Sequence, residues 1–447
     1  MPRILLEPFS RALVIESPHP SLDGELARMG IQATRVASVP DEDALIAAIQ
    51  GVDAQILFKR SQVPVTRRVI EACPSLHAVQ LCCIGDDSVD KVACAENGLL
   101  VFNDPISNGR SVVELAIGHL IALSRRLYET DVAMSASRWE KNDRGRYEVR
   151  GKVLGIVGLG NIGRQVARAS EALGMQIAFF DNRLVAQEVG TEMGWKRYNT
   201  LSELFRASDM VTAHTSARDS WGRDNEGLLN EALSELAADR PDNSPRVFLN
   251  LARGNVHSVE ALRAAVVAGA VRYAAVDVYP DEPAPGQSAS WVNPYADLPN
   301  VVCTPHIGAA TQEAQPRIAH RVAETMGYFS RYGWMRDCVL APRVKLSVGE
   351  AAWGRAVLAV VHSTRRGTKK AIDDAIYAAG ASNLFSTHQD FEVGVAYDLS
   401  VLDSALSPEQ IDDLVAHARE LAGDDGAIRA VRQIPVPAHG WTALSGA

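Results

Sequence analysis

Short apolar runs alternate along this chain with longer stretches in which apolar residues recur at helical spacing. The short runs are β-branched or apolar and predict strands at 12–15, 54–58, 78–82, 99–102, 153–157, 176–180, 210–213, 246–250, 273–278 and 300–304. The periodic stretches between them predict helices, among them 112–127 and 259–270. Strand–helix alternation at this spacing predicts parallel sheets covered by helices on both faces over the first 330 residues.

The periodicity breaks at 327–346, a segment that we interpret as a linker. Beyond it, apolar runs at 355–362 and 392–401 and helical patterns at 369–380 and 408–422 indicate a compact βαββα-type unit. A chain of 447 residues is long enough for two or three domains, each with its own core. We therefore expect α/β domains followed by a smaller third domain.

A dinucleotide-binding fingerprint, GLGNIG, lies between a predicted strand and a helical pattern. Gly158 permits the tight turn, Gly160 lets the backbone approach a pyrophosphate, and Gly163 lets the helix pack closely on the strand. The N–H groups at the start of the helix then face the pyrophosphate. Asp181 ends the next predicted strand, where a carboxylate accepts hydrogen bonds from the adenosine ribose and favours NAD over NADP. The nearby Arg183 leaves the binding of a 2′-phosphate open.

Candidate catalytic groups follow three later predicted strands: Arg253 in NLARG, Glu282 in DVYPDEP and His306 in CTPHIGA. The carboxyl ends of strands in doubly wound sheets face the cofactor crevice, so these side chains are expected to converge there. A histidine suits proton transfer near neutral pH, and a carboxylate bonded to the imidazole fixes its tautomer. An arginine can hold a substrate carboxylate at two points. These are the roles that hydride transfer between an alcohol and a ketone would need, but taken singly each residue is more often structural than catalytic.

Composition and charge narrow the classes of partner. Hydrophobic residues make up 47% of the chain and charged residues 22%, as in an ordinary globular protein. The net charge of −9 argues against a nucleic-acid partner but leaves a basic pocket for an anionic small molecule open. No apolar run has the roughly 18 residues of a membrane helix, and the N-terminus lacks a signal core. We therefore expect a cytoplasmic protein with no membrane partner. The six cysteines form no CxxC pair, so no metal is expected.

The motifs NLARG, DVYPDEP and TPHIGAATQEA together resemble the D-isomer-specific 2-hydroxyacid dehydrogenase family. The resemblance spans about residues 10–335, since further segments fit the same pattern at 58–66, 82–90, 102–120 and 137–163. It implies two doubly wound, Rossmann/flavodoxin-like parallel-sheet domains, with NAD as the cofactor. The implied substrate-binding domain is discontinuous (1–108 and 305–337), and the NAD-binding domain (109–304) is inserted into it.

The resemblance also implies roles for individual residues. Arg253 binds and polarises the substrate, Glu282 partners the imidazole, and His306 acts as acid and base. The implied cofactor-binding residues are Gly158, Gly160, Asn161, Ile162, Gly163, Asp181, Leu251, Ala252, Asp277 and Gly308. The implied substrate-binding residues are Arg60, Ser61, Cys83, Ile84 and Gly85.

The implied activity is NAD-dependent oxidation of 3-phospho-D-glycerate to 3-phosphohydroxypyruvate, which opens serine biosynthesis. Gln62 departs from the family pattern because related enzymes often have a second arginine there. Asp86 and Asp87 add negative charge that would repel a bound phosphate unless the carboxylates point away. These departures keep two alternatives open: a dehydrogenase for another D-2-hydroxy acid, and a non-enzymatic NAD-sensing regulator of the same fold.

The last hundred residues resemble an ACT-type regulatory domain, a small βαββαβ ligand sensor, over 350–437. His362 and Asn383 match the pattern of that domain, whereas Thr364 stands where an amide is usual. The resemblance leaves open an amino-acid effector such as L-serine or a role in assembly alone. The resemblance to the dehydrogenase family further implies a homodimer through the NAD-binding domain, with Trp139 and Lys141 in the contact segment. A tetramer through the C-terminal domain is left open.

Overall fold

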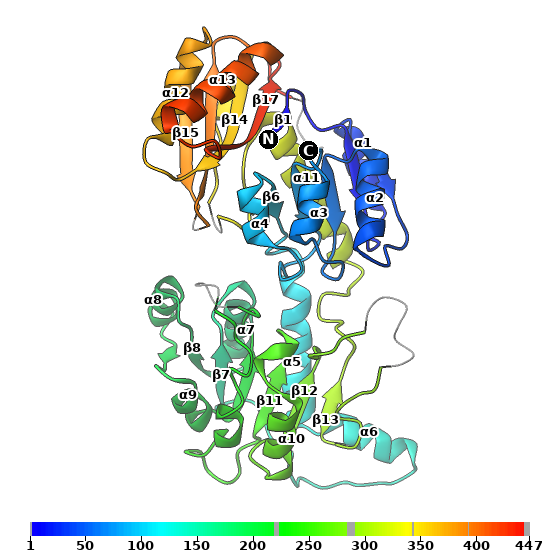
Figure 1. The fold of residues 1–447 in the computed structure, drawn as a ribbon. Helices are drawn as coiled ribbons and strands as arrows, with labels where there is room; N and C mark the ends of the chain where they lie inside the picture. Colours follow the sequence, from blue (N-terminus) through cyan, green and yellow to red (C-terminus); the bar gives the residue numbers. More distant parts are fainter. Residues whose placement is uncertain (1, 219–222, 284–290, 342–343, 392, 442–447) are drawn as a thin grey trace. The chain divides into compact units, whose positions relative to one another are not determined.

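The computed structural model describes residues 2–218, 223–283, 291–341, 344–391 and 393–441 (Figure 1). The chain divides into two compact units: unit 1 holds residues 1–107 and 315–447, and unit 2 holds residues 108–314. Each unit contains a parallel sheet with helices on both faces. The α/β fold class predicted from the alternating pattern is therefore confirmed.

Unit 2 is built on a seven-stranded parallel sheet in the order β13-β12-β11-β10-β7-β8-β9. Its strands are β7 (Val153–Val157), β8 (Gln176–Phe180), β9 (Lys196–Arg197), β10 (Met210–Ala213), β11 (Val247–Asn250), β12 (Tyr273–Val276) and β13 (Val301–Cys303). Numbered within the unit, this is the order 3-2-1-4-5-6 of doubly wound nucleotide-binding sheets, extended by one strand. The strand order reverses between β7 and β10, and such sheets bind their ligands outside that point.

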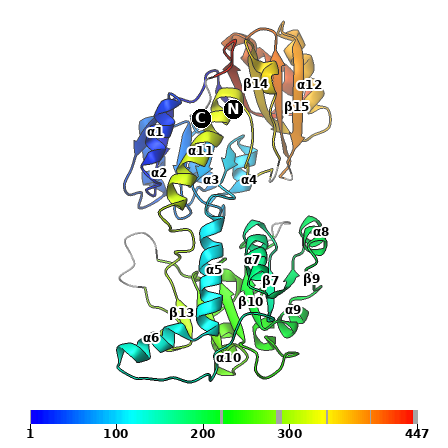
Figure 2. The ribbon, with the colours of Figure 1, turned by 180° about the vertical axis from the view of Figure 1, so that it is seen from behind.

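Helices cover both faces of this sheet (Figures 1 and 2). One face packs against α5 (Gly109–Ser124), α7 (Asn161–Ala172) and α8 (Leu184–Glu192). The other packs against α9 (Leu201–Ala207), η1 (Ala232–Glu235) and α10 (Val259–Val267). Because both faces are buried, the strands read in the sequence as continuous apolar runs.

Unit 1 contains a five-stranded parallel sheet in the order β3-β2-β4-β5-β6. Its strands are β2 (Arg11–Val14), β3 (Gln32–Arg35), β4 (Ile56–Lys59), β5 (Ala78–Leu81) and β6 (Leu100–Phe102). One face packs on α1 (Ser21–Arg28) and α11 (Ala314–Tyr332), and the other on α2 (Glu42–Val52), α3 (Arg67–Ala72) and α4 (Lys91–Glu96). This is the flavodoxin-like order 2-1-3-4-5, with its reversal between β2 and β4.

A second five-stranded sheet of unit 1 has the order β1-β17-β14-β16-β15. Its strands are β1 (Arg3–Leu5), β14 (Ala356–Ser363), β15 (Asn383–Asp390), β16 (Val395–Leu402) and β17 (Ile428–Pro435). Helices α12 (Thr368–Ala378) and α13 (Pro408–Ala422) pack on one face. The C-terminal part therefore runs β-α-β-β-α-β, and the N-terminal β1 adds a parallel edge strand to β17.

The opposite face of this C-terminal sheet shares one hydrophobic core with the first sheet of unit 1. Tyr397 and Ile434 of the C-terminal sheet belong to the same buried cluster as Phe102 and Phe329. The Tyr397 hydroxyl also donates to the Gly333 carbonyl at 2.7 Å. The interpretation of 327–346 as a linker is wrong at its start, because α11 continues to Tyr332 and buries Phe329 in that core.

The described helices and strands agree closely with the predicted apolar runs in unit 2 and less closely at the two ends of the chain. Three predicted strands, at 153–157, 176–180 and 210–213, coincide with β7, β8 and β10. Strands β1 and β3 were not predicted. The predicted division into domains 1–108 with 305–337, 109–304 and 350–437 stays a prediction.

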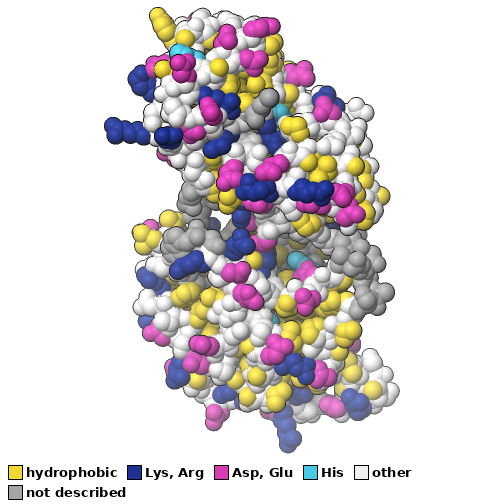
Figure 3. Space-filling view, in the orientation of Figure 1, with side chains coloured by type: hydrophobic (Ala, Val, Ile, Leu, Met, Phe, Trp, Pro, Cys, Tyr) yellow, Lys and Arg dark blue, Asp and Glu magenta, His cyan; other side chains and the backbone are white. Residues whose placement is uncertain are grey.

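The surface carries both signs of charge, and Figure 3 shows Lys and Arg side chains interspersed with Asp and Glu. Among the described residues, no helix has both the length and the apolar character that crossing a membrane requires.

Candidate active site

The GLGNIG turn adopts the geometry that its glycines predict. Gly158 has a φ of +90°, and a Cβ there would lie 2.5 Å from the His214 carbonyl oxygen, at the carboxyl end of β10. A Cβ on Gly163 would lie 2.1 Å from the Gly158 carbonyl oxygen, so α7 packs directly on the turn. At Gly160 the nearest atom to an added Cβ is Arg183 Nη2 at 3.7 Å. Backbone atoms therefore leave no room for a side chain at Gly158 and Gly163, whereas there is space beside Gly160.

Helix α7 begins at Asn161, with Gly160 as an N-cap that offers no side chain to the first N–H groups. Asn161 and Ile162 thus lie in the first turn of the helix, where N–H groups and the helix dipole favour a bound phosphate. Both the open turn and this helix start fit the pyrophosphate of a dinucleotide.

Asp181 follows β8 and is 6% exposed. Its Oδ1 accepts hydrogen bonds from the Arg183 backbone N–H and Nε, both at 2.9 Å. Its Oδ2 accepts from the Leu159 N–H at 2.8 Å and from Arg183 Nη2 at 2.6 Å. Burial would raise the pKa of Asp181, but the Arg183 guanidinium and the two N–H donors outweigh burial and lower it. The carboxylate that the sequence assigns to the ribose is ionised and accepts four hydrogen bonds, three of them from Arg183.

The structure brings together His306 and Glu282, which the sequence predicts as an acid–base pair. His306 Nδ1 lies 2.7 Å from Glu282 Oε2, and Glu282 Oε1 accepts the Tyr279 N–H at 3.2 Å. Both side chains are partly exposed, His306 by 48% and Glu282 by 35%. Burial would raise the pKa of Glu282, but the bonds from His306 and Tyr279 and the charge of Arg253 produce a net lowering. Because the carboxylate only accepts, Nδ1 carries the proton and Nε2 is left to exchange one with a substrate.

A buried carboxylate, Asp277, holds the turn that presents His306. Its Oδ1 accepts from Thr304 Oγ1 at 2.6 Å and from the Ile307 N–H at 2.9 Å, and its Oδ2 accepts from the Gly308 N–H at 2.8 Å. His306 itself has a φ of +53°, a conformation that L-residues adopt only when their surroundings enforce it. Asp277 and Gly308, which the sequence assigns to the cofactor, therefore also shape the backbone on both sides of the histidine.

Arg253 is presented by a turn that two other residues of NLARG determine. Asn250, fully buried at the end of β11, accepts the Ala252 N–H at 3.0 Å and donates to the Arg253 carbonyl at 3.0 Å. A Cβ on Gly254 would lie 2.1 Å from the Tyr279 carbonyl group, so only glycine lets this turn pack against the β12 loop. Asn250 and Gly254 lay within the motif quoted for Arg253, but their roles were not predicted. Leu251 and Ala252 are both 7% exposed and lie in the same turn.

The predicted substrate-binding residues of unit 1 lie at the carboxyl ends of β4 and β5. Arg60 and Ser61 follow β4, and Cys83 to Gly85 follow β5. The second loop is held by Asn103 Nδ2, which donates to the Ile84 carbonyl at 2.7 Å, and by Cys83 Sγ on the Gly85 carbonyl at 3.3 Å. Asp86 pairs with Lys91 at 3.1 Å. The positive charge of Lys91 therefore offsets part of the negative charge that Asp86 and Asp87 add after Gly85.

In the C-terminal part, the predicted effector residues lie on two strands and a loop. His362 of β14 is 2% exposed, its Nδ1 contacts the Ser363 carbonyl at 2.8 Å, and its ring stacks on His388. Asn383 of β15 donates to Asp373 and Ser400, both at 3.1 Å, and Thr364 donates its backbone N–H to the Gly394 carbonyl. The structure therefore engages His362 and Asn383 in internal contacts.

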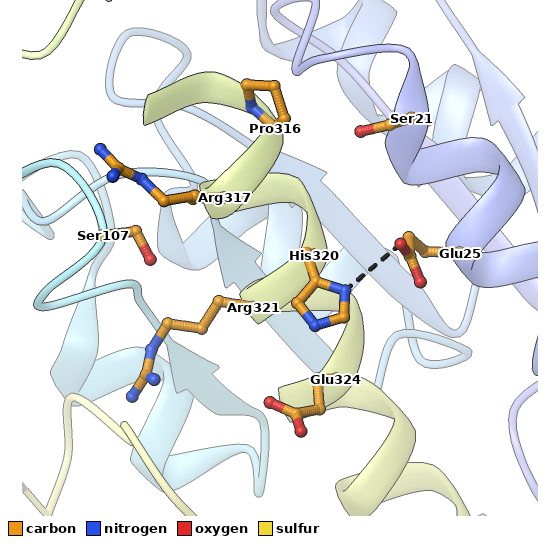
Figure 4. A pocket seen from close by; sticks show the side chains of 8 residues that line it. All are labelled: Ser21, Glu25, Ser107, Pro316, Arg317, His320, Arg321 and Glu324. Carbon is orange, nitrogen blue, oxygen red and sulfur yellow. Dashed lines mark hydrogen bonds and ion pairs between the residues drawn. The ribbon is translucent and has the colours of Figure 1, made fainter. Parts of the chain in front are cut away.

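A groove elsewhere in unit 1 lies between α1, the segment at Ser107 and the first turns of α11 (Figure 4). His320 and Glu25 point toward one another across it at 3.3 Å, and Arg321 pairs with Asp337 at 2.6 Å. The lining residues are Ser21, Glu25, Ser107, Pro316, Arg317, His320, Arg321 and Glu324. None of these residues was predicted as a site residue. Because acidic and basic side chains both line the groove, its charge does not favour an anionic ligand.

Residues 117–308 match the family model described as "D-isomer specific 2-hydroxyacid dehydrogenase, NAD binding domain". The chain is also similar over most of its length to D-3-phosphoglycerate dehydrogenase of Haemophilus influenzae, with 33% identity over 87% of this chain and 88% of that protein. D-3-phosphoglycerate dehydrogenase 2 of Saccharomyces cerevisiae is 31% identical over 92% of this chain and 86% of that protein.

Solved structures share the fold over about three quarters of the chain. A glyoxylate reductase from Paecilomyes thermophila matches with a TM-score of 0.62 and 24% identity, covering 74% of this chain and 98% of that one. D-lactate dehydrogenase from Aquifex aeolicus, in complex with NAD and lactic acid, matches with a TM-score of 0.58 and 22% identity, covering 71% and 95%. At these identities the likeness extends to the fold.

Proposed function

The chain belongs to the D-isomer specific 2-hydroxyacid dehydrogenase family, and from this premise we propose that it oxidises 3-phospho-D-glycerate to 3-phosphohydroxypyruvate. NAD is the cofactor. The choice of substrate is supported by relatives of that name that align with most of the chain. The observation that carries the chemistry is the 2.7 Å hydrogen bond between His306 Nδ1 and Glu282 Oε2 in a unit with a dinucleotide fingerprint.

In the oxidative direction, His306 Nε2 accepts the proton of the substrate hydroxyl group. Glu282 holds Nδ1–H and stabilises the imidazolium that results. Arg253 binds the substrate carboxylate and polarises the reacting C–O bond. NAD, when bound, supplies the acceptor for the hydride that leaves the same carbon. In the reverse direction the imidazolium returns the proton to the ketone oxygen.

We assign the substrate phosphate to Arg60 and Ser61, and the reacting end of the substrate to the loop of Cys83, Ile84 and Gly85. The Asp86–Lys91 pair supports this assignment, because a neutralised carboxylate repels a phosphate less than a free one. The cofactor roles of Gly158, Gly160, Gly163, Asp181, Leu251 and Ala252 are part of the same proposal.

The regulatory and assembly features stay predictions. A homodimer through unit 2 is supported by the exposure of Trp139, 79% of which faces solvent in the predicted contact segment. An effector such as L-serine, with His362, Thr364 and Asn383 as its contacts, and a tetramer through the C-terminal part are further predictions. So is the cytoplasmic location.

The proposed function is tested by NADH consumption with 3-phosphohydroxypyruvate, hydroxypyruvate, pyruvate and 2-oxoglutarate as substrates. We expect clear selectivity for the phosphorylated ketone, and L-serine added to the same assay tests the effector. Equal or better rates with an unphosphorylated ketone would contradict the substrate assignment. Binding of NAD with no turnover of any of the four would favour the NAD-sensing alternative.

A second substrate class, an unphosphorylated D-2-hydroxy acid, is favoured by one observation. Gln62 is exposed in the Arg60–Ser61 loop, and an amide offers a phosphate no charge. The same assay separates the two substrate classes.

A further inference from the structure

A buried pair of opposite charges lies beneath the loop that carries Arg60 and Ser61. Lys59, the last residue of β4, is fully buried, and the side chain of Glu16, just after β2, is 4% exposed. Their Nζ and Oε1 atoms are 3.7 Å apart. Burying two charges costs free energy that an apolar pair would not cost, so stability alone gives no reason for these residue types.

The hydrogen bonds of the pair go to the loop. Glu16 Oε2 accepts the Gln62 N–H at 3.2 Å, and Oε1 accepts the Val63 N–H. Lys59 Nζ donates to the Arg60 carbonyl at 2.7 Å. The backbone is therefore held on both sides of Ser61 by contacts that do not use the Arg60 and Ser61 side chains.

Lys59 also reaches the second predicted substrate loop. Its Nζ donates to Ser88 Oγ at 2.8 Å. The two loops are joined again by the Val65 N–H, which donates to the Ser88 carbonyl at 2.8 Å, and by the Asp90 N–H, which donates to the Val65 carbonyl at 2.9 Å. One ammonium group thus fixes the loop after β4 relative to the loop after β5.

The location in the sheet favours a role in binding. Glu16 follows β2 and Lys59 ends β4, and the strand order of this sheet reverses between these two strands. Open α/β sheets bind ligands outside the carboxyl ends of the strands at this reversal. The backbone there is strained as well: Glu16 has a φ of +59° and Ser17 a φ of +50°. Strain of this kind persists where surrounding contacts enforce it, and it is concentrated at ligand-binding sites.

We propose that Lys59 and Glu16 are positioning residues that hold the Arg60–Ser61 loop against the Ser88 loop in the conformation that binds the anionic end of the substrate. Neither residue touches the substrate. The inference rests on the proposed function, because it takes the phosphate-bearing hydroxy acid as the ligand of this loop.

The kinetic test compares Lys59→Met, Glu16→Gln and the double variant with the parent enzyme. We expect each single change to raise KM for 3-phosphohydroxypyruvate about tenfold, with kcat and KM for NADH changed by less than about threefold. The preference for the phosphorylated ketone over hydroxypyruvate should fall in parallel. The matched control is Arg11→Gln in β2 of the same sheet, which breaks an exposed ion pair with Asp53 at the end of α2 and should leave all constants unchanged.

If the variants at the buried residues Lys59 and Glu16 fail to fold, Ser88→Ala is used for the test instead. It removes the hydrogen bond from Lys59 on a partly exposed loop and should raise the same KM roughly threefold. Unchanged KM in all folded variants, or a lower kcat with no change in KM, would show a structural role only and overturn the inference.

Hydrogen exchange tests the loop without any substrate. In Glu16→Gln the amides of Gln62 and Val63 lose a charged acceptor and should exchange about tenfold faster, while amides of β7 stay unchanged. Equal protection in the variant would overturn the inference. If the parent enzyme prefers another ketone, the proposed function fails, and the same variants are then measured with that ketone. In that case, a KM for the preferred ketone that is unchanged in the variants would overturn the inference as well.

Discussion

His306 is distinguished from the other histidines by what surrounds it rather than by its residue type. His320 also lies beside a glutamate, Glu25, at 3.3 Å, and is half exposed like His306. His306 differs from His320 in that it follows strand β13, and the buried Asp277 carboxylate holds the turn on both sides of it. A histidine beside a glutamate therefore occurs at more than one place in this chain, and the surroundings of His306 are what distinguish it.

Replacing His306 by Ala should lower kcat by at least about a hundredfold, because general acid–base catalysis contributes roughly 10²- to 10⁴-fold. The dissociation constant for NADH, measured by fluorescence titration, should change little. His320→Ala is the matched control and should leave kcat unchanged. Comparable losses of turnover and NADH affinity in His306→Ala would contradict the assignment.

Asp181 and Arg183 together should set the choice between NAD and NADP. Asp181→Ala removes the carboxylate that repels a 2′-phosphate and releases Arg183 from its two-point ion pair. We expect the ratio of kcat/KM for NADH to that for NADPH to fall at least about tenfold. Arg183→Ala should move the ratio the other way. A ratio unchanged in Asp181→Ala would remove this residue from the ribose site.

At the scale of single elements, a buried carboxylate in the C-terminal part lies close to charged or titratable side chains of a neighbouring helix and strand. Asp398 of β16 is fully buried and lies 3.4 Å from Lys369 Nζ of α12 and 3.7 Å from His388 Nδ1 of β15. The Asp398 carboxylate, together with Asp390 at 3.1 Å from Nε2, raises the pKa of His388 above its usual 6.5, against the effect of burial. Burial would raise the pKa of Asp398, but His388 and Lys369 lower it. His388 thus links β15 to the buried carboxylate of β16, and protonation of the imidazole strengthens this link.

The sign of the resulting pH dependence follows from these directions. A raised pKa in His388 means that its contribution to stability is fully present below pH 6.5 and is lost as pH rises through the higher folded-state value. Exchange protection of β15 and β16 amides should therefore fall as the pH rises above 6.5, after correction for intrinsic exchange. In His388→Gln this fall should be absent, and its persistence would assign the pH dependence to another group.

At the scale of the whole molecule, the C-terminal sheet belongs to unit 1 for two reasons. Its inner face packs on the rest of that unit, and its edge strand β1 contacts the helices beside the first sheet. Its inner face shares the core of the first sheet. Arg3 of β1, 6% exposed, donates to the carbonyls of Ile70, Cys73, Leu76 and Asn97. The N-terminal strand thus pairs with β17 and reaches α3 and α4 of the first sheet's layer. The two sheets are expected to unfold together.

Arg3→Ala should lower the free energy of unfolding of unit 1 by about 3 kcal/mol, since it leaves several buried carbonyl groups without a donor. Chemical denaturation followed by exchange protection of β6 and β16 measures the effect in both sheets. Arg28→Ala, which removes an exposed arginine that pairs with Glu25, should change the free energy of unfolding by less than about 0.5 kcal/mol. Loss of protection confined to one sheet would contradict joint unfolding.

The local pattern of the sequence was enough to predict the nucleotide-binding sheet and its chemistry. Strands β7, β8 and β10 are buried on both faces, so each appears as a continuous apolar run that needs no knowledge of its neighbours. The site motifs are short runs of consecutive residues and can be recognised without knowing the fold: GLGNIG, NLARG and the loops with Glu282 and His306. The predicted contact between His306 and Glu282 was found, because both loops leave the same edge of one parallel sheet.

Other features depend on residues far apart in the chain, and periodicity carries no information about them. Strand β1 has three residues and is a strand only because β17 lies beside it, more than four hundred residues later. The end of α11 was read as a linker because its aromatic residues find their partners in the C-terminal sheet. The Lys59–Glu16 pair, the Arg183 contacts of Asp181 and the hold of Asp277 on the His306 turn were likewise decided by tertiary structure. In each case a buried charge needs partners that only the folded chain brings within hydrogen-bond distance.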